Sequence, residues 1–322
     1  MKLDITPGMA QDAGMLKFIL AIALALPGAA LARTQGAGPL ESTAVVLAYP
    51  GVEAGAQGAS ALSLEAFTDH AEYLKRAGVP VLGAREMAES LKNGQAVPAG
   101  AVTLTFDAPL VAMKKPVFEA LAGHGVPFTL FIAPAQIGKA PLVMGWADVK
   151  DLAGRKGVTI GLTLTGVPDD LVTLKREFNA ALTAFRENMG FQPEVFAYPG
   201  GDYSRELKTL VAGAGFTAAF GLQSGAAYEG TDFLALPRFG MAGDYGTIER
   251  FQSIIHTLPL PAADLEPAES LFTGDAPLIG FTVLPEYKGL LEHLSCFASG
   301  QGKVTPQILG DARVEIRLRE SV

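Results

Sequence analysis

Asp107 is the residue of this sequence most clearly placed to carry out acid–base chemistry. It directly follows the apolar, β-branched run 101–106 (AVTLTF), which predicts a strand that ends at Phe106. Barrel enzymes hold their chemistry at the ends of their strands, and a carboxylate is one of the groups that can serve there. The other interpretation is a strand-end aspartate that caps the loop after it. The residues alone favour neither role over the other.

Two aromatic residues are candidates for contact with a ligand. Tyr198 begins the turn Tyr198-Pro199-Gly200, which follows a short apolar run, and Trp146 is the only tryptophan of the chain. An aromatic ring offers a flat apolar face on which a ligand can stack. For Tyr198 the position on a turn favours contact with a ligand, whereas for Trp146 packing in the core is the favoured interpretation.

Metal chemistry has few candidate ligands in this sequence. There is a single cysteine, Cys296, so neither an internal disulfide nor a cysteine cage for a metal is available. No two of the histidines are spaced as a ligand pair; they are His70, His124, His256 and His293. We therefore expect no bound metal cofactor, and we interpret His256 as a partly exposed structural residue.

The elements that must position these residues alternate between short apolar runs and amphipathic helical stretches. One helix is expected after Ser63, a good N-terminal cap, and ends at Gly78, and a longer one covers 169–189. Such alternation predicts parallel strands with helices outside. Because it repeats without a division into halves, it favours a (β/α) barrel. The strands are expected at 43–48, 101–106, 128–132, 158–161, 194–197 and 216–220.

The order and spacing of several motifs resemble the NodB-homology polysaccharide deacetylases that act on N-acetylglucosamine polymers. The motifs are 105–109 (TFDAP), 161–166 (GLTLTG), 197–201 (AYPGG), 223–225 (QSG) and 236–239 (LPRF). The resemblance runs from about Thr43 to Pro261. It implies a distorted, TIM-like (β/α) barrel of the polysaccharide deacetylase type.

The same resemblance implies a divalent metal such as zinc, held by an aspartate and two histidines, with a second aspartate as the base. Carried over residue by residue, the base position is Asp107, the metal-binding aspartate is Ala108, and the two histidines are Leu162 and Gly166. Ala, Leu and Gly side chains donate nothing to a metal, and a catalytic zinc needs about three protein ligands. The resemblance therefore predicts an impaired enzyme with a vestigial base.

Two functions remain open at this point. One is a pseudoenzyme that binds a polysaccharide containing N-acetylglucosamine, or a protein partner, with sugar contacts at Tyr198, Pro199, Gly200 and Trp146. The other is an active hydrolase that removes N-acetyl groups through a rebuilt site. The net charge of −8 and the absence of a dense basic cluster argue against a nucleic-acid partner.

The N-terminus carries the pattern of an export signal. Residues 16–32 (LKFILAIALALPGAALA) contain one lysine, a short apolar run and the small-x-small end Ala30-Leu31-Ala32. We expect residues 1–32 to be removed, with Met15 as a possible true start, and a periplasmic or extracellular protein that does not span the membrane. Further along, we expect a flexible tether over 33–42, the barrel over 43–257, a Pro-rich linker over 258–270 and a small β-rich extension over 271–322.

Overall fold

The computed structural model describes residues 20–24, 40, 42–56, 61–267, 270, 278–298 and 302–318. The chain divides into two compact units. One comprises Ala37–Pro259, and the other comprises Met1–Gly36 together with Leu260–Val322. Apart from residues 20–24, 40 and 42, the expected signal peptide and tether lie outside the described residues. Among the described helices, none is both long and apolar enough to cross a membrane.

A curled, mainly parallel sheet forms the centre of the first unit. Its strand order is β10-β9-β8-β7-β6-β2-β11, and only β11 runs antiparallel, beside β2. Two short strands, β5 (Val81–Leu82) and β12 (Phe239–Gly240), pair in parallel with β6 and β2. This arrangement confirms the predicted (β/α) barrel-type fold. The main strands are β2 (Thr43–Tyr49), β6 (Ala101–Phe106), β7 (Phe128–Ile132), β8 (Val158–Leu162), β9 (Val195–Ala197), β10 (Ala218–Phe220) and β11 (Ala226–Tyr228).

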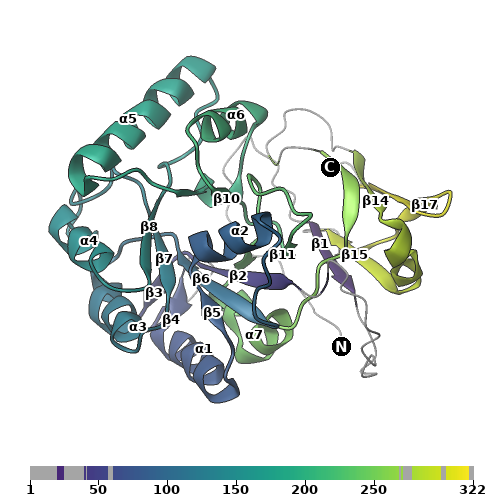
Figure 1. The fold of residues 1–322 in the computed structure, drawn as a ribbon, viewed down its shortest axis with the longest axis horizontal. Helices are drawn as coiled ribbons and strands as arrows, with labels where there is room; N and C mark the ends of the chain where they lie inside the picture. Colours follow the sequence, from purple (N-terminus) through teal and green to yellow (C-terminus); the bar gives the residue numbers. More distant parts are fainter. Residues whose placement is uncertain are drawn as a thin grey trace. The chain divides into compact units, whose positions relative to one another are not determined.

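Helices surround this sheet, and α1, α3, α4 and α5 lie around strands β6, β7 and β8 (Figure 1). Helix α1 begins after Ser63, whose hydroxyl accepts a hydrogen bond from the Ala66 N–H, and ends at Gly78 with φ of 63°, as the sequence predicts. The helices are α1 (Leu64–Ala77), α2 (Ala84–Lys92), α3 (Ala120–Gly123), α4 (Trp146–Ala153), α5 (Leu171–Met189), α6 (Arg205–Gly213) and α7 (Ile248–Ile254). A π-helical turn, Lys114–Glu119, leads into α3.

The two faces of the curled sheet bury different sets of side chains. On β6, Leu104 and Phe106 join a large apolar cluster that includes residues of α1, α4 and α5. Ala101 belongs instead to a second cluster with Met87 and Leu91 of α2. Because successive side chains of a strand point to opposite faces, Thr103 and Thr105 share the face of Ala101. This second face is the inner face of the barrel.

Residues 233–241 lie between β10 and β2, the two strands that the segment joins by backbone hydrogen bonds. The Ala219 N–H donates to the Phe233 carbonyl (2.8 Å) and the Gly221 N–H to the Leu236 carbonyl (2.9 Å), so the segment begins beside β10. It then runs beside β2 as β12, and the Met241 N–H donates to the Ala48 carbonyl (2.8 Å). We call residues 233–241 the closing segment.

A buried histidine joins α1 to the barrel. His70 is 1% exposed, and its Nε2 lies 3.0 Å from the Gly246 carbonyl oxygen while its Nδ1 lies 3.2 Å from the Tyr49 hydroxyl. Since a carbonyl only accepts, the proton is on Nε2, and Nδ1 accepts from Tyr49. The ring stacks on Phe251 with centroids 4.0 Å apart. Burial lowers the pKa of His70 to about 4.

Stability is expected to fall as the pH drops from about 6.5 to about 4. In that window the unfolded chain binds a proton at His70 that the folded chain, with its lowered pKa, does not bind. The loss in the free energy of unfolding should reach roughly 3 kcal/mol. Urea unfolding at several pH values measures it, with His70→Gln expected to flatten the dependence. The exposed His256, changed to Gln, is the matched control; an equal effect of both changes would contradict the assignment to His70.

The second unit is built from antiparallel strands. One sheet has the order β13-β14-β18-β17, and another pairs β15 with β1 and β16. Val314 and Ile316 of β18 are fully buried beside Phe281 and Cys296. Burial raises the pKa of the Cys296 thiol to about 11. The strands are β1 (Leu20–Leu24), β13 (Ala262–Glu266), β14 (Leu278–Val283), β15 (Leu294–Ala298), β16 (Gly302–Val304), β17 (Gln307–Leu309) and β18 (Arg313–Arg317).

Candidate functional site at the carboxyl ends of the strands

Asp107, the expected base position, is paired with a buried arginine of the closing segment. Its Oδ1 accepts a hydrogen bond from an Arg238 guanidinium nitrogen, Nη1, at 2.6 Å. The Arg238 side chain is 0% exposed, whereas that of Asp107 is 25% exposed. The carboxylate therefore stands at the end of β6 with one side held from within the barrel and the other side accessible to solvent.

Arg238 is fixed by further contacts on the inner face of the barrel. Its Nε donates to the Gly221 carbonyl (2.8 Å), and its Nη1 also lies 3.1 Å from the Thr105 hydroxyl, which donates to the Leu47 carbonyl (2.8 Å). The guanidinium lies over the ring of Phe131 at 5.5 Å. Its Nη2 is buried without a hydrogen-bond partner in the described part of the chain. Through one side chain this arginine joins β6 to the residue that follows β10.

The sequence suggested neither this ion pair nor the buried position of Arg238. Arg238 was part of the motif Leu236-Pro237-Arg238-Phe239, but 131 residues separate it from Asp107. The sequence did contain one indication of the pair, a charged residue within a largely apolar segment. A charge in such a segment is buried only when it has a partner.

The structure corrects the assignment of a metal-ligand position to Leu162. Leu162 is fully buried in the outer cluster, among residues of α4 and α5, and so lies on the opposite face of the sheet from Asp107. A Cβ added at Gly161 would meet the rings and methyls of Phe131 and Val195 on the inner face. Because the side chains alternate, Thr163 and not Leu162 shares the face of Asp107.

The other two assigned positions also provide no metal donor. Ala108 follows Asp107 in the loop after β6, and Gly166 lies in the loop after β8, where a Cβ would meet no atom within 4 Å. Among the described residues there is no group of three His, Cys, Asp or Glu side chains that could hold a metal ion. The residues present at this edge thus do not fit the divalent metal that the resemblance implies.

Tyr198 lies in the core, which departs from the expected contact with a sugar ring. It is 1% exposed, its hydroxyl donates to the Leu234 carbonyl at 2.8 Å, and its ring contacts those of Phe196 and Tyr203. Burial raises its pKa. Stacking on a ligand would require this side chain to leave the core. Of the turn itself, Pro199 is half-buried and Gly200 is exposed with φ of 60°.

Trp146 remains available at the same edge. It is the first residue of α4, is half-buried, and packs against the outer cluster. Nearby, Lys114 and Asp148 form an ion pair at 2.5 Å that raises the pKa of the lysine and lowers that of the aspartate through their hydrogen bond. An exposed apolar side chain, Leu142 (74% exposed), lies in the loop that leads to α4.

An open cleft of about 380 Å³ lies beside this edge. It is bounded by the loops that follow β7 and β8 and by the middle of α5. Thr163, Thr165 and Glu177 provide its polar groups, and a row of alanines on α5 provides its apolar wall. The cleft therefore offers hydroxyl and carboxylate groups beside an apolar surface.

Part of the barrel matches the model of a known protein family. The family model for polysaccharide deacetylases matches residues 94–219. A search of curated proteins finds no match to this sequence.

Three solved structures illustrate the likeness of the fold. IcaB from Ammonifex degensii has 19% identity and a TM-score of 0.60 over 67% of this chain and 98% of its own. The Streptococcus pyogenes deacetylase PplD, in complex with acetate, has 15% identity and a TM-score of 0.60 over 67% and 99%. A de-N-acetylase from Aggregatibacter actinomycetemcomitans has 16% identity and a TM-score of 0.55 over 65% and 100%. Residues 94–219 are thus similar to the polysaccharide deacetylase family, and the barrel shares the fold of these deacetylase structures.

Proposed function

We propose that this chain is an exported, polysaccharide-binding member of the family that has lost metal-dependent deacetylation. The observation that carries the proposal is that the edge holding Asp107 has no set of side chains able to hold a metal in the described part of the chain. The partner that fits best is a polysaccharide containing N-acetylglucosamine, since one similar structure is a de-N-acetylase. The binding surface would be the cleft beside α5 together with Trp146.

The chemistry that remains is that of a positioned carboxylate. Asp107 can accept a proton or a hydrogen bond from a sugar hydroxyl or an amide N–H, with Arg238 fixing its orientation. Polarising an acetamide carbonyl and supplying hydroxide are tasks that a metal performs in related chemistry, and they are worth several kcal/mol. Without them the hydrolysis rate should be lower by on the order of a thousandfold or more.

The proposal predicts that the purified protein contains well under one equivalent of zinc, cobalt or nickel per chain. Elemental analysis after dialysis measures this, and an acetate-release assay on chitooligosaccharides, with and without added zinc, measures activity. No release above background is expected under either condition. About one metal ion per chain together with zinc-dependent acetate release would favour the alternative function, an active hydrolase, and would contradict the proposal.

Export is a separate part of the proposal. It is supported by the short apolar run and the Ala30-Leu31-Ala32 end of the N-terminal segment. N-terminal sequencing of protein recovered from the periplasm or medium is expected to begin near Arg33. Recovery of the protein with residues 18–26 still attached would contradict a cleaved signal.

A further inference from the structure

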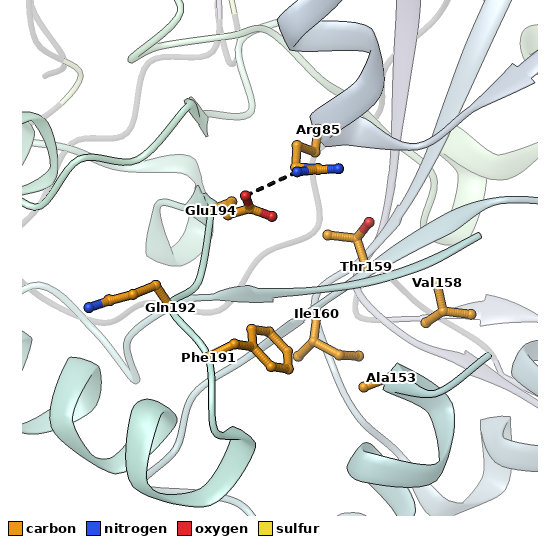
Figure 2. Close-up of a pocket in the computed structure, with 8 residues that line it drawn as sticks. All are labelled: Arg85, Ala153, Val158, Thr159, Ile160, Phe191, Gln192 and Glu194. Carbon is orange, nitrogen blue, oxygen red and sulfur yellow. Dashed lines mark hydrogen bonds and ion pairs between the residues drawn. The ribbon is translucent and has the colours of Figure 1, made fainter. Parts of the chain in front are cut away.

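A second cleft opens at the opposite ends of the strands from Asp107. It has a volume of about 210 Å³ (Figure 2). Val158 and Thr159, which begin β8, and Glu194, which directly precedes β9, line it together with Arg85 of α2. It therefore belongs to the amino ends of these strands, away from the edge where the family resemblance places catalysis.

One side of this cleft is apolar and is dominated by an exposed aromatic ring. Phe191 is 45% exposed, although large apolar side chains of a barrel usually pack away from water. Its ring is held by an edge-on contact with Phe185, with centroids 5.6 Å apart and planes at 81°. Figure 2 shows Phe191 beside Ile160 and Ala153, so that the ring and two aliphatic side chains form one wall. An aromatic face kept in place and open to solvent is suited to stacking.

The other side of the cleft is polar and nearly neutral. Arg85 Nη1 and Glu194 Oε1 form an ion pair at 3.0 Å, with the two side chains 44% and 50% exposed. Thr159 adds a hydroxyl, and Gln192, whose Oε1 accepts from the Arg186 Nε at 2.9 Å, adds an amide. An exposed ion pair contributes little to stability, so its donors and acceptors can turn to a ligand at small cost.

The combination selects a class of ligand. A phosphate or carboxylate would be repelled by Glu194 beside Arg85, and a purely apolar molecule would take the exposed parts of both side chains out of water without offering them a hydrogen bond. A pyranose ring has an apolar C–H face for Phe191 and equatorial hydroxyls that suit guanidinium, carboxylate and amide groups. We propose that this cleft is a binding site for a neutral pyranose unit of a saccharide chain. The site is distinct from the edge that holds Asp107 and does not depend on catalysis there.

The test uses triacetylchitotriose as the probe and the ¹⁵N-labelled full chain. Titration followed by NMR is expected to shift the side-chain amide of Gln192 and the backbone amide of Thr159, and calorimetry gives the affinity. Mannitol, an open-chain polyol with no ring face, is the matched control ligand and is expected not to bind. No shift at these residues with the trisaccharide, or equal shifts with mannitol, would overturn the proposal.

Variants assign the binding to this cleft. Phe191→Leu keeps an apolar side chain but removes the flat face, and it is expected to weaken binding about tenfold. Arg85→Gln should also weaken binding. Val172→Ala changes a side chain near the start of α5 that is 76% exposed, and it should leave the affinity unchanged. Binding that survives Phe191→Leu but is lost in Trp146→Ala would place the saccharide at the carboxyl edge, which would overturn this site and leave the proposed function standing.

Discussion

Replacing Arg238 by methionine is expected to lower the free energy of unfolding by roughly 3 kcal/mol. The change removes the hydrogen bonds of the guanidinium to the Gly221 carbonyl and the Thr105 hydroxyl and leaves the Asp107 carboxylate without its cation. Removing one partner of such a pair costs more than the pair itself contributes, because the Gly221 carbonyl and the Asp107 carboxylate lose the donor that held them. Urea unfolding followed by circular dichroism measures the difference from the parent.

Two further variants test the reason for that loss. Arg155→Met removes a surface arginine just after α4 that pairs with Asp151 of that helix, and it should leave the unfolding midpoint close to that of the parent. Asp107→Asn should destabilise less than Arg238→Met, because the asparagine Oδ1 can still accept a hydrogen bond from Arg238, and Arg238 keeps its bonds to the Gly221 carbonyl and the Thr105 hydroxyl. If Arg238→Met behaves like Arg155→Met, the pair does not hold the closing segment in place.

Restoring a metal site should succeed only if the ligand positions are moved by one residue. The variant Ala108→Asp/Thr163→His/Val167→His keeps the four-residue spacing of the two histidines but places the first one on the face of Asp107. Three ligands are about what a catalytic zinc requires. We expect it to bind zinc about a hundredfold or more tighter than the parent does, as measured by titration calorimetry.

The unshifted variant, Ala108→Asp/Leu162→His/Gly166→His, is the matched comparison. Its histidine at position 162 would enter the outer core, where Leu162 is fully buried, and should cost roughly 2–5 kcal/mol of stability without gaining a metal. Circular dichroism shows which variants remain folded. If the unshifted variant is folded and binds zinc better than the shifted one, the side-chain orientation of β8 described above is wrong.

The local signals of the sequence predicted much of the barrel. The strands 101–106 and 128–132 are found with their expected bounds, as β6 and β7, and α1 begins and ends at its two capping residues. The predicted helix 169–189 is α5, which starts two residues later because Asp170 caps it by accepting a hydrogen bond from the Thr173 N–H. These successes share a cause: each depends on residues that are neighbours in the chain.

Elements defined by distant partners were not predicted. Helix α2 was missed, although its buried face with Ala84, Met87, Ala88 and Leu91 closes one end of the barrel interior, because it follows a strand of only two residues. Strands β11 and β12 are three and two residues long and exist through their pairing with β2. The orientation of Leu162 was missed for a related reason, since a motif gives the order of residues while the pleat decides which face each one occupies.

The closing segment also has a consequence for how the chain reaches its folded state. The first long strand, β2, finds two of its partners, β11 and β12, only after all the helices up to α6 have been synthesised. Until then one edge of β2 presents unpaired backbone groups, which are a template for pairing with another chain. Contacts this distant in sequence are slow to form because loop closure must precede them. Truncation before residue 241 should therefore yield a product that aggregates. Because Arg238 lies in the closing segment, its bonds to Gly221 and Asp107 can form only when the barrel closes.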